Sequence, residues 1–163
     1  MFKIKLSILL LISFITFSCT NNNQEYQFHQ KYSLKHISGE YDGLLLKNYL
    51  MNSLKKINMY DPNSTLEIQA SINHNTNLFI TNIDNTSDRE KINSTLSMHI
   101  INTQLECTIF SEDTNVSQFF IYASGDKFLS NQRAGRKIRE RNMEALVEKF
   151  MNKMRSIQNK CNE

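Results

Sequence analysis

The sequence has few of the residues that break regular structure. It contains four glycines and one proline, Pro62, and this scarcity favours long helices and strands over a loop-rich scaffold. Catalytic and ligand-binding motifs are missing as well: the four histidines lack the spacing of metal ligands, and no CxxC, HExxH, GxSxG or glycine-rich phosphate loop occurs. We therefore expect a protein without enzymatic activity, without a metal site and without a cofactor.

A large excess of positive charge is missing too. The chain has 19 basic and 16 acidic residues. Two of the basic residues, Lys3 and Lys5, lie at the extreme N-terminus, so the rest of the chain is nearly neutral. A protein that binds nucleic acid in general is usually much more basic. We expect no nucleic-acid partner.

The N-terminus, MFKIKLSILLLISFITFSCTNNNQ, has the order of an export signal. Two lysines come first, the mostly apolar stretch Leu6–Phe17 follows, and small side chains occupy the third and first positions before Cys19. A cut before Cys19 would make this cysteine N-terminal. The arrangement resembles a bacterial lipoprotein signal, in which the new terminal cysteine receives acyl chains that tether the protein to a membrane. Cys19 is therefore the expected lipidation site.

This signal departs from the usual lipoprotein pattern at two positions, since Thr16 replaces a leucine and the bulky Phe17 replaces a small residue. An ordinary cleaved signal and an uncleaved anchor are the alternatives. The anchor is disfavoured because crossing the hydrocarbon takes about 20 apolar residues. The expected organisation is a lipoprotein signal peptide at 1–18, a lipidated tether at 19–31, one α+β domain at 32–158 and a polar tail at 159–163.

Two segments have apolar residues at helical spacing. The first covers about Tyr41–Asn58, where leucines and an isoleucine share one face and lysines point away. The second runs from an N-cap at Ser130 or Asn131 to about Ile157 and carries an apolar stripe along its length. Both stripes are expected to face a hydrophobic core.

Alternation of apolar and polar residues predicts strands in the rest of the chain. The first covers 32–37, and 66–80 fits one long strand with a weak polar middle as well as two strands and a turn. The remaining predicted features are a connection at 84–91, a third strand at 91–110 with a one-residue bulge near 101–103, a turn at 111–115 and a fourth strand from 116. The order β-α-β-β-β-α predicts an α+β two-layer sandwich, with two helices on one face of an about four-stranded, mostly antiparallel sheet.

Behind a lipidated cysteine, this order of elements resembles the LPS-assembly lipoprotein family, LptE. The segments that carry the resemblance are LLLKNYLMNSLKKI, LEIQAS, DNTSDREKINSTL, FFIYAS and RKIRERNMEALVEKFMNKM. The resemblance covers about Ile37–Ile157 and lies in size and arrangement, because none of these segments is a specific motif. It implies a lipid-anchored protein at the periplasmic face of the outer membrane. Such a protein plugs and helps assemble the lipopolysaccharide-translocating barrel LptD, and binds lipopolysaccharide during its insertion into the outer leaflet.

The resemblance also points to residues for the lipopolysaccharide phosphates, which call for arginine and lysine. Arg89 and Lys91 are candidates near the hairpin, although Ile83 stands before the turn where family members often carry a basic residue. Arg133 and Arg136 are candidates at the approach to the last helix. A solvated basic face is the alternative explanation for that second group.

Three questions stay open at this level. The aromatic segment Phe119–Tyr122 fits either a patch facing a barrel or lipid, or packing in the core. Cys107 and Cys161 would pair in an oxidising periplasm only if the geometry allows it. The alternative function is that of another envelope-assembly or surface lipoprotein, which acts as a protein-binding module.

Overall fold

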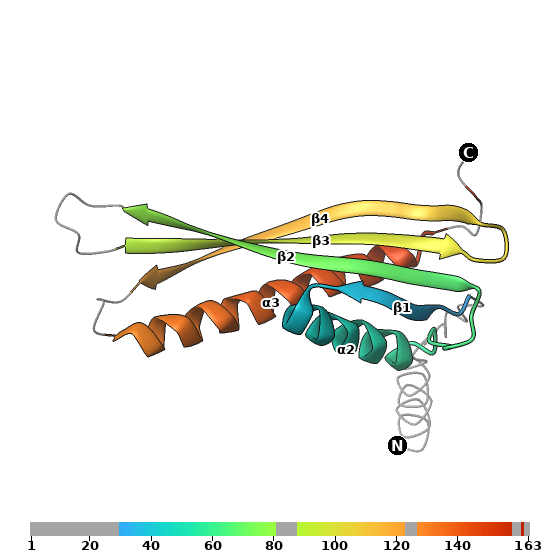
Figure 1. The fold of residues 1–163 in the computed structure, drawn as a ribbon, viewed down its shortest axis with the longest axis horizontal. Helices are drawn as coiled ribbons and strands as arrows, with labels where there is room; N and C mark the ends of the chain where they lie inside the picture. The colour runs from blue at the N-terminus through green and yellow to red at the C-terminus, as the bar shows by residue number, and fades with distance from the viewer. Residues whose placement is uncertain (1–29, 81–87, 123–126, 158–160, 162–163) are drawn as a thin grey trace, which may run out of the picture.

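The computed structural model describes residues 30–80, 88–122, 127–157 and Cys161. The described elements are β1 (Ser33–Ser38), α2 (Glu40–Lys56), β2 (Leu66–Ile80), β3 (Asp88–Asn102), β4 (Cys107–Tyr122) and α3 (Phe128–Met154). The strands form one sheet in the order β1-β2-β3-β4 (Figure 1). β1 runs parallel to β2 and the other two pairs are antiparallel. The predicted α+β class and the order β-α-β-β-β-α are confirmed.

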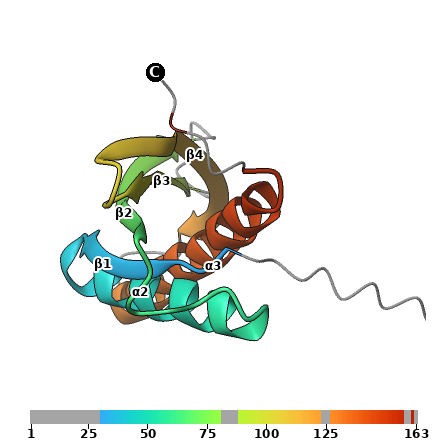
Figure 2. The ribbon, with the colours of Figure 1, turned by 90° about the vertical axis from the view of Figure 1, so that its right-hand side faces the viewer.

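Both helices cover one face of the sheet, so the structure has two layers. Viewed along the long axis, α2 lies below β1 and α3 below β4 (Figure 2). The core fills the space between the layers: α2 buries Leu46, Leu50 and Leu54, and β2 and β3 bury inward-facing residues such as Ile68 and Ile100. Burying one such side chain contributes roughly 1.5 to 3 kcal/mol. The apolar residues that the sequence pattern places on one face of these elements therefore form the core.

The polar middle of the β2 sequence does not interrupt the strand. The register with β3 is continuous from Leu66 opposite Asn102 to Ile80 opposite Asp88. Because side chains alternate between the two faces of a strand, His74 takes the same inward direction as Ile68 and Ile72.

The connection between β3 and β4 differs from the prediction. A turn spans 103–106, where the backbone amides of Gln104 and Leu105 donate to Asn102 Oδ1, and Glu106 has φ of 51°. The predicted bulge near 101–103 is therefore wrong, because a turn follows Asn102. The predicted turn at 111–115 is also wrong, since these residues lie inside β4. One extra residue does occur nearby: Ile100 pairs with Phe110 and Ile101 with Thr108, so the irregularity lies at Ile109 of β4.

Helix α3 begins earlier than predicted. Its N-cap position is Lys127, which makes no side-chain capping bond, so the expected cap at Ser130 or Asn131 was wrong. Both of those residues lie inside the first turns, and Asn131 is buried. The early start extends the helix along the part of the sheet that α2 does not cover.

A disulfide joins Cys107, the first residue of β4, to Cys161 behind α3, with the two Cα atoms 5.7 Å apart. This settles the open question of pairing. The bond closes a chain segment that contains all of β4 and α3. Disulfides persist in oxidising compartments, which agrees with an exported protein.

Candidate functional site

The four candidate phosphate-binding residues do not form a single site. Arg89 and Lys91 lie in β3 instead of the connection, and 81–87 is outside the described residues. Because Ile92 faces the helices and is buried, Arg89 and Lys91 point to the opposite, uncovered face of the sheet. Arg133 and Arg136 are exposed on α3, beneath the other face. All four lie toward the same end of the molecule (Figure 1).

We call this end the distal end: β2 and β4 end there, and β3 and α3 begin there (Figure 1). It carries an apolar group beside the cations. Lys91 pairs with Phe119 across β3 and β4, and its Nζ lies 5.5 Å from the ring centroid, a cation–π contact. Phe119 and Ile121 are exposed, so the interpretation that these two side chains pack in the core is wrong.

Apart from Ile101, the rest of the uncovered face of β3 and β4 is polar. Its partly or fully exposed side chains include Asn93, Thr95, Ser97, His99, Ser111, Asp113, Asn115 and Ser117. Neither α2 nor α3 lies over this face (Figure 2). A broad hydrophilic sheet surface of this kind is suited to an aqueous surrounding.

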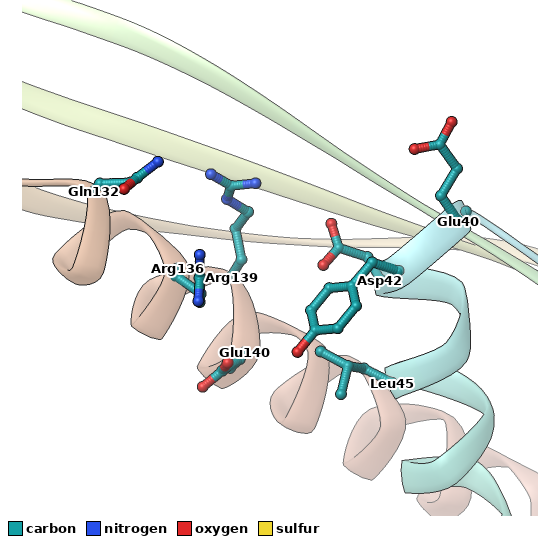
Figure 3. Close-up of a pocket in the computed structure, with 9 residues that line it drawn as sticks. Glu40, Asp42, Leu45, Gln132, Arg136, Arg139 and Glu140 are labelled. Atoms are coloured by element: carbon teal, nitrogen blue, oxygen red, sulfur yellow. The ribbon is translucent and has the colours of Figure 1, made fainter. Parts of the chain in front are cut away.

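A cleft of about 530 Å³ separates the start of α2 from the middle of α3 (Figure 3). Arg136 and Arg139 enter it from α3, while Asp42 enters from α2. The further lining residues are Gly39, Glu40, Tyr41, Leu45, Gln132 and Glu140. Arg136 thus shares its surroundings with carboxylates, whereas Arg133 does not line the cleft. The mixed charge makes the cleft a weaker anion site than a purely basic one.

Behind the cleft lies a buried polar group that the sequence analysis missed. Asn142 is fully buried on α3, and its Nδ2 donates to Ser94 Oγ at 2.8 Å and to the Ile92 carbonyl oxygen at 3.3 Å. His74 Nδ1 lies 2.7 Å from the same hydroxyl. The hydroxyl proton of Ser94 is available to Nδ1, which leaves the imidazole proton on Nε2. That nitrogen faces Asp42 Oδ2 at 3.8 Å.

The surroundings of His74 favour its neutral form. Burial lowers its pKa, Asp42 opposes this, and Arg139 adds to it. Signals for both members of the group were in the sequence, because His74 holds an inward position of β2 and Asn142 lies four residues before the buried Leu146. Both polar residues interrupt apolar patterns, and such interruptions mark buried hydrogen-bonded groups.

The described part of the chain holds no group of three or more His, Cys, Asp or Glu side chains that could bind a metal ion. None of the helices described is both long enough and apolar enough to cross a membrane. Cys19, the expected lipidation site, is outside the described residues.

Comparison with known proteins gives a match at the level of structure alone. No protein-family model and no curated protein sequence matches the chain. The solved rare lipoprotein B of Shewanella oneidensis superimposes with a TM-score of 0.64 over 78% of this chain and 95% of its own, at 10% identity. The chain has a fold found in bacterial lipoproteins.

Two further lipoprotein structures support the same conclusion. A minor lipoprotein of Acinetobacter baumannii matches with a TM-score of 0.56 at 13% identity, over 76% of this chain and 88% of its own. A candidate lipoprotein of Caulobacter crescentus matches with a TM-score of 0.51 at 15% identity, over 75% and 85%. At these identities the likeness concerns the fold, and the function has to be argued from the chain itself.

Proposed function

We propose that this protein is a lipid-anchored envelope lipoprotein without enzymatic activity. It would sit at the periplasmic face of the outer membrane, plug and help assemble the lipopolysaccharide-translocating barrel LptD, and bind lipopolysaccharide during its insertion. The observation that carries the proposal is the fold, which it shares with solved lipoproteins over most of the chain. The export signal ending at Cys19 supports the lipid anchor.

Two features of the structure are consistent with a barrel plug. The uncovered sheet face is hydrophilic, and the interiors of large outer-membrane barrels are polar and water-filled. The disulfide between Cys107 and Cys161 fits a protein that folds outside the cytosol. A tether at Cys19 would raise the concentration of the domain near membrane partners without any new contact.

One observation favours the alternative, a lipoprotein that binds only protein partners. The candidate phosphate ligands are divided: Arg89 and Lys91 lie on the uncovered face, and Arg133 and Arg136 on α3. Phosphate recognition is strongest where several donors converge on one anion. Under the alternative, the basic side chains are solvated and the uncovered face contacts protein.

Crosslinking in living cells, followed by detergent extraction and purification of this protein, separates the two functions. The barrel-plug proposal predicts that a large β-barrel copurifies, and that purified lipopolysaccharide competes with a fluorescent lipopolysaccharide for the complex. Recovery of soluble or peptidoglycan-associated partners without a barrel would contradict the plug. Recovery of a barrel without lipopolysaccharide binding would favour the protein-binding alternative.

A further inference from the structure

Exposed apolar side chains gather at the distal end. Of the eight large hydrophobic residues exposed in the described part of the chain, five lie there, each 55–70% exposed. These five, which we call the distal apolar group, are Leu78, Phe119, Ile121, Phe128 and Leu129. Single exposed apolar residues are common on protein surfaces, but gathered ones mark interaction sites.

The architecture explains why the helix face of the sheet is open at this end. Helix α2 reaches only the half of the sheet near β1, so α3 alone lies against the distal half (Figure 1). Phe119 and Ile121 point to the uncovered face, Leu78 points to the helix face, and Phe128 and Leu129 begin α3. A planar partner that approaches the tip of the molecule would therefore meet side chains from both layers.

The distal apolar group is accompanied by positive charge. Arg89 pairs with Ile121 and Lys91 with Phe119 across the two strands. Exposed Lys127 and Arg133 flank the start of α3. Glu90, which lies between Arg89 and Lys91 in β3, points to the helix face and lines a small pocket with Phe128 and Arg139. The charged side chains described beside the apolar group on the uncovered face and at the start of α3 are therefore basic.

We propose that the distal end docks onto the interface of a bilayer that contains anionic phospholipid. Aromatic and aliphatic side chains would enter the boundary between headgroups and acyl chains, and the cations would meet the negatively charged headgroups. Apolar burial combined with electrostatic attraction is the physical basis of interfacial membrane binding. Each basic residue near an anionic surface strengthens this attraction.

The dimensions of the chain are compatible with docking at both ends. Helix α3 has 27 residues, a length of about 40 Å at 1.5 Å per residue. The eleven residues between Cys19 and Lys31 reach at most about 40 Å when fully extended. A protein anchored at Cys19 could thus lie along the membrane and touch it with the distal end. The inference goes beyond the proposed function and does not depend on a barrel partner.

The absence of tryptophan from the chain allows a sharp test. Ile121→Trp places a single fluorescent reporter in the distal apolar group. Leu105→Trp places a matched reporter, also exposed, in the turn at the opposite end of β3 and β4. The full mature protein is mixed with vesicles of equal phosphatidylglycerol and phosphatidylcholine whose acyl chains carry bromine, a quencher. Circular dichroism confirms that both variants are folded.

Docking predicts that the Ile121→Trp emission shifts to shorter wavelength and is strongly quenched, while the Leu105→Trp emission changes little. Arg89→Glu together with Lys91→Glu should abolish the effect, and vesicles of phosphatidylcholine alone should weaken it. Equal quenching of the two reporters, no quenching at Ile121→Trp, or insensitivity to the charge reversal would overturn the proposal. A shift caused only by added envelope protein would assign the surface to a protein partner and would overturn it as well.

Discussion

The two helix glycines, Gly43 and Gly135, differ in the space available for a side chain. A Cβ atom on Gly43 of α2 would lie 2.7 Å from the Ser38 carbonyl oxygen, a backbone atom that cannot move aside. A Cβ on Gly135 of α3 would meet Ile92 and Phe120 side chains at 3.8 and 3.9 Å, ordinary contact distances. The absence of a side chain is therefore required for packing only at Gly43.

We expect Gly43→Ala to lower the free energy of unfolding by about 1 to 3 kcal/mol, because the steric conflict outweighs the better helix propensity. Gly135→Ala should raise it by up to about 1 kcal/mol, since alanine restricts the unfolded chain more than glycine does. Urea unfolding of both variants against wild type measures the difference. Equal effects of the two substitutions would contradict the close approach of α2 to Ser38.

The buried histidine predicts a pH dependence of stability. Burial lowers the pKa of His74, so the unfolded chain binds a proton at pH values where the folded chain does not. The free energy of unfolding should therefore fall as pH drops through about 6.5, the ordinary histidine pKa, and level off below the folded pKa. His74→Asn should lose this part of the slope, measured by urea unfolding from about pH 8 to about pH 5. Parallel curves for the two proteins would contradict the prediction.

At the residue scale, the sequence indicates which side chains are buried better than it indicates their partners. The inward parity of His74 and the helical spacing from Asn142 to Leu146 could both be read from the chain. The shared hydrogen-bond partner, Ser94, and the close approach of Gly43 to Ser38 could not, because each depends on how separate elements pack.

At the scale of elements, α3 offers a direct test of lipopolysaccharide binding. Reversing Arg133 and Arg136 to Glu should weaken binding roughly tenfold or more, since a charge-assisted hydrogen bond contributes about 1.5 to 3 kcal/mol. Both side chains are exposed, so stability should change by less than about 0.5 kcal/mol for each substitution. Arg141→Glu in α3 with Arg155→Glu at the C-cap of the same helix is the matched control. Unchanged binding of the first pair would remove it from the site.

The disulfide ties two elements whose ends are far apart in the sequence. Cys107 and Cys161 are separated by 54 positions in the sequence. The bond closes a long loop in the unfolded chain, so it should stabilise the fold by about 2 to 4 kcal/mol. Replacing both cysteines with serine should lower the midpoint of urea unfolding by a corresponding amount. Wild type treated with a reductant should behave like the variant, and an unchanged midpoint in reductant would argue against the bond.

The helices and strands could largely be predicted, because their apolar patterns extend over many residues. Both helices and all four strands occur in the expected order. The turn after Asn102 could not be separated from a bulge, since either feature returns the later apolar residues to the core. The cause of the turn is local: Asn102 Oδ1 accepts hydrogen bonds from two backbone amides, which replace the hydrogen bonds that a continuing strand would make.

At the scale of the whole molecule, the sequence predicted the layers but not which end would be left open. The lengths of α2 and α3 determine that the distal half of the sheet has one helix instead of two. This difference leaves Leu78 exposed on the helix face of β2, whereas Phe119 and Ile121 are exposed because they point to the opposite, uncovered face. The bases of β3 and α3 share this end because both elements begin there. The four candidate phosphate ligands therefore lie at the same end of the molecule. Arg89 and Lys91 are on the uncovered face of the sheet, and Arg133 and Arg136 are on the helix side.

The proposed anchor at Cys19 is the property on which the proposed cellular role of the whole molecule depends. Cys19→Ala removes the thiol that would receive the acyl chains, so the protein should move from the membrane to the soluble fraction and lose its barrel partner. Ser18→Ala keeps a small residue before the cut and serves as the control that stays membrane-bound. A high-salt wash before fractionation releases binding that depends on charges at the distal end, because salt screens exposed charges. If Cys19→Ala still sediments with the membranes after that wash, or if wild type is soluble, then Cys19 does not anchor the chain and the proposed envelope role loses its basis.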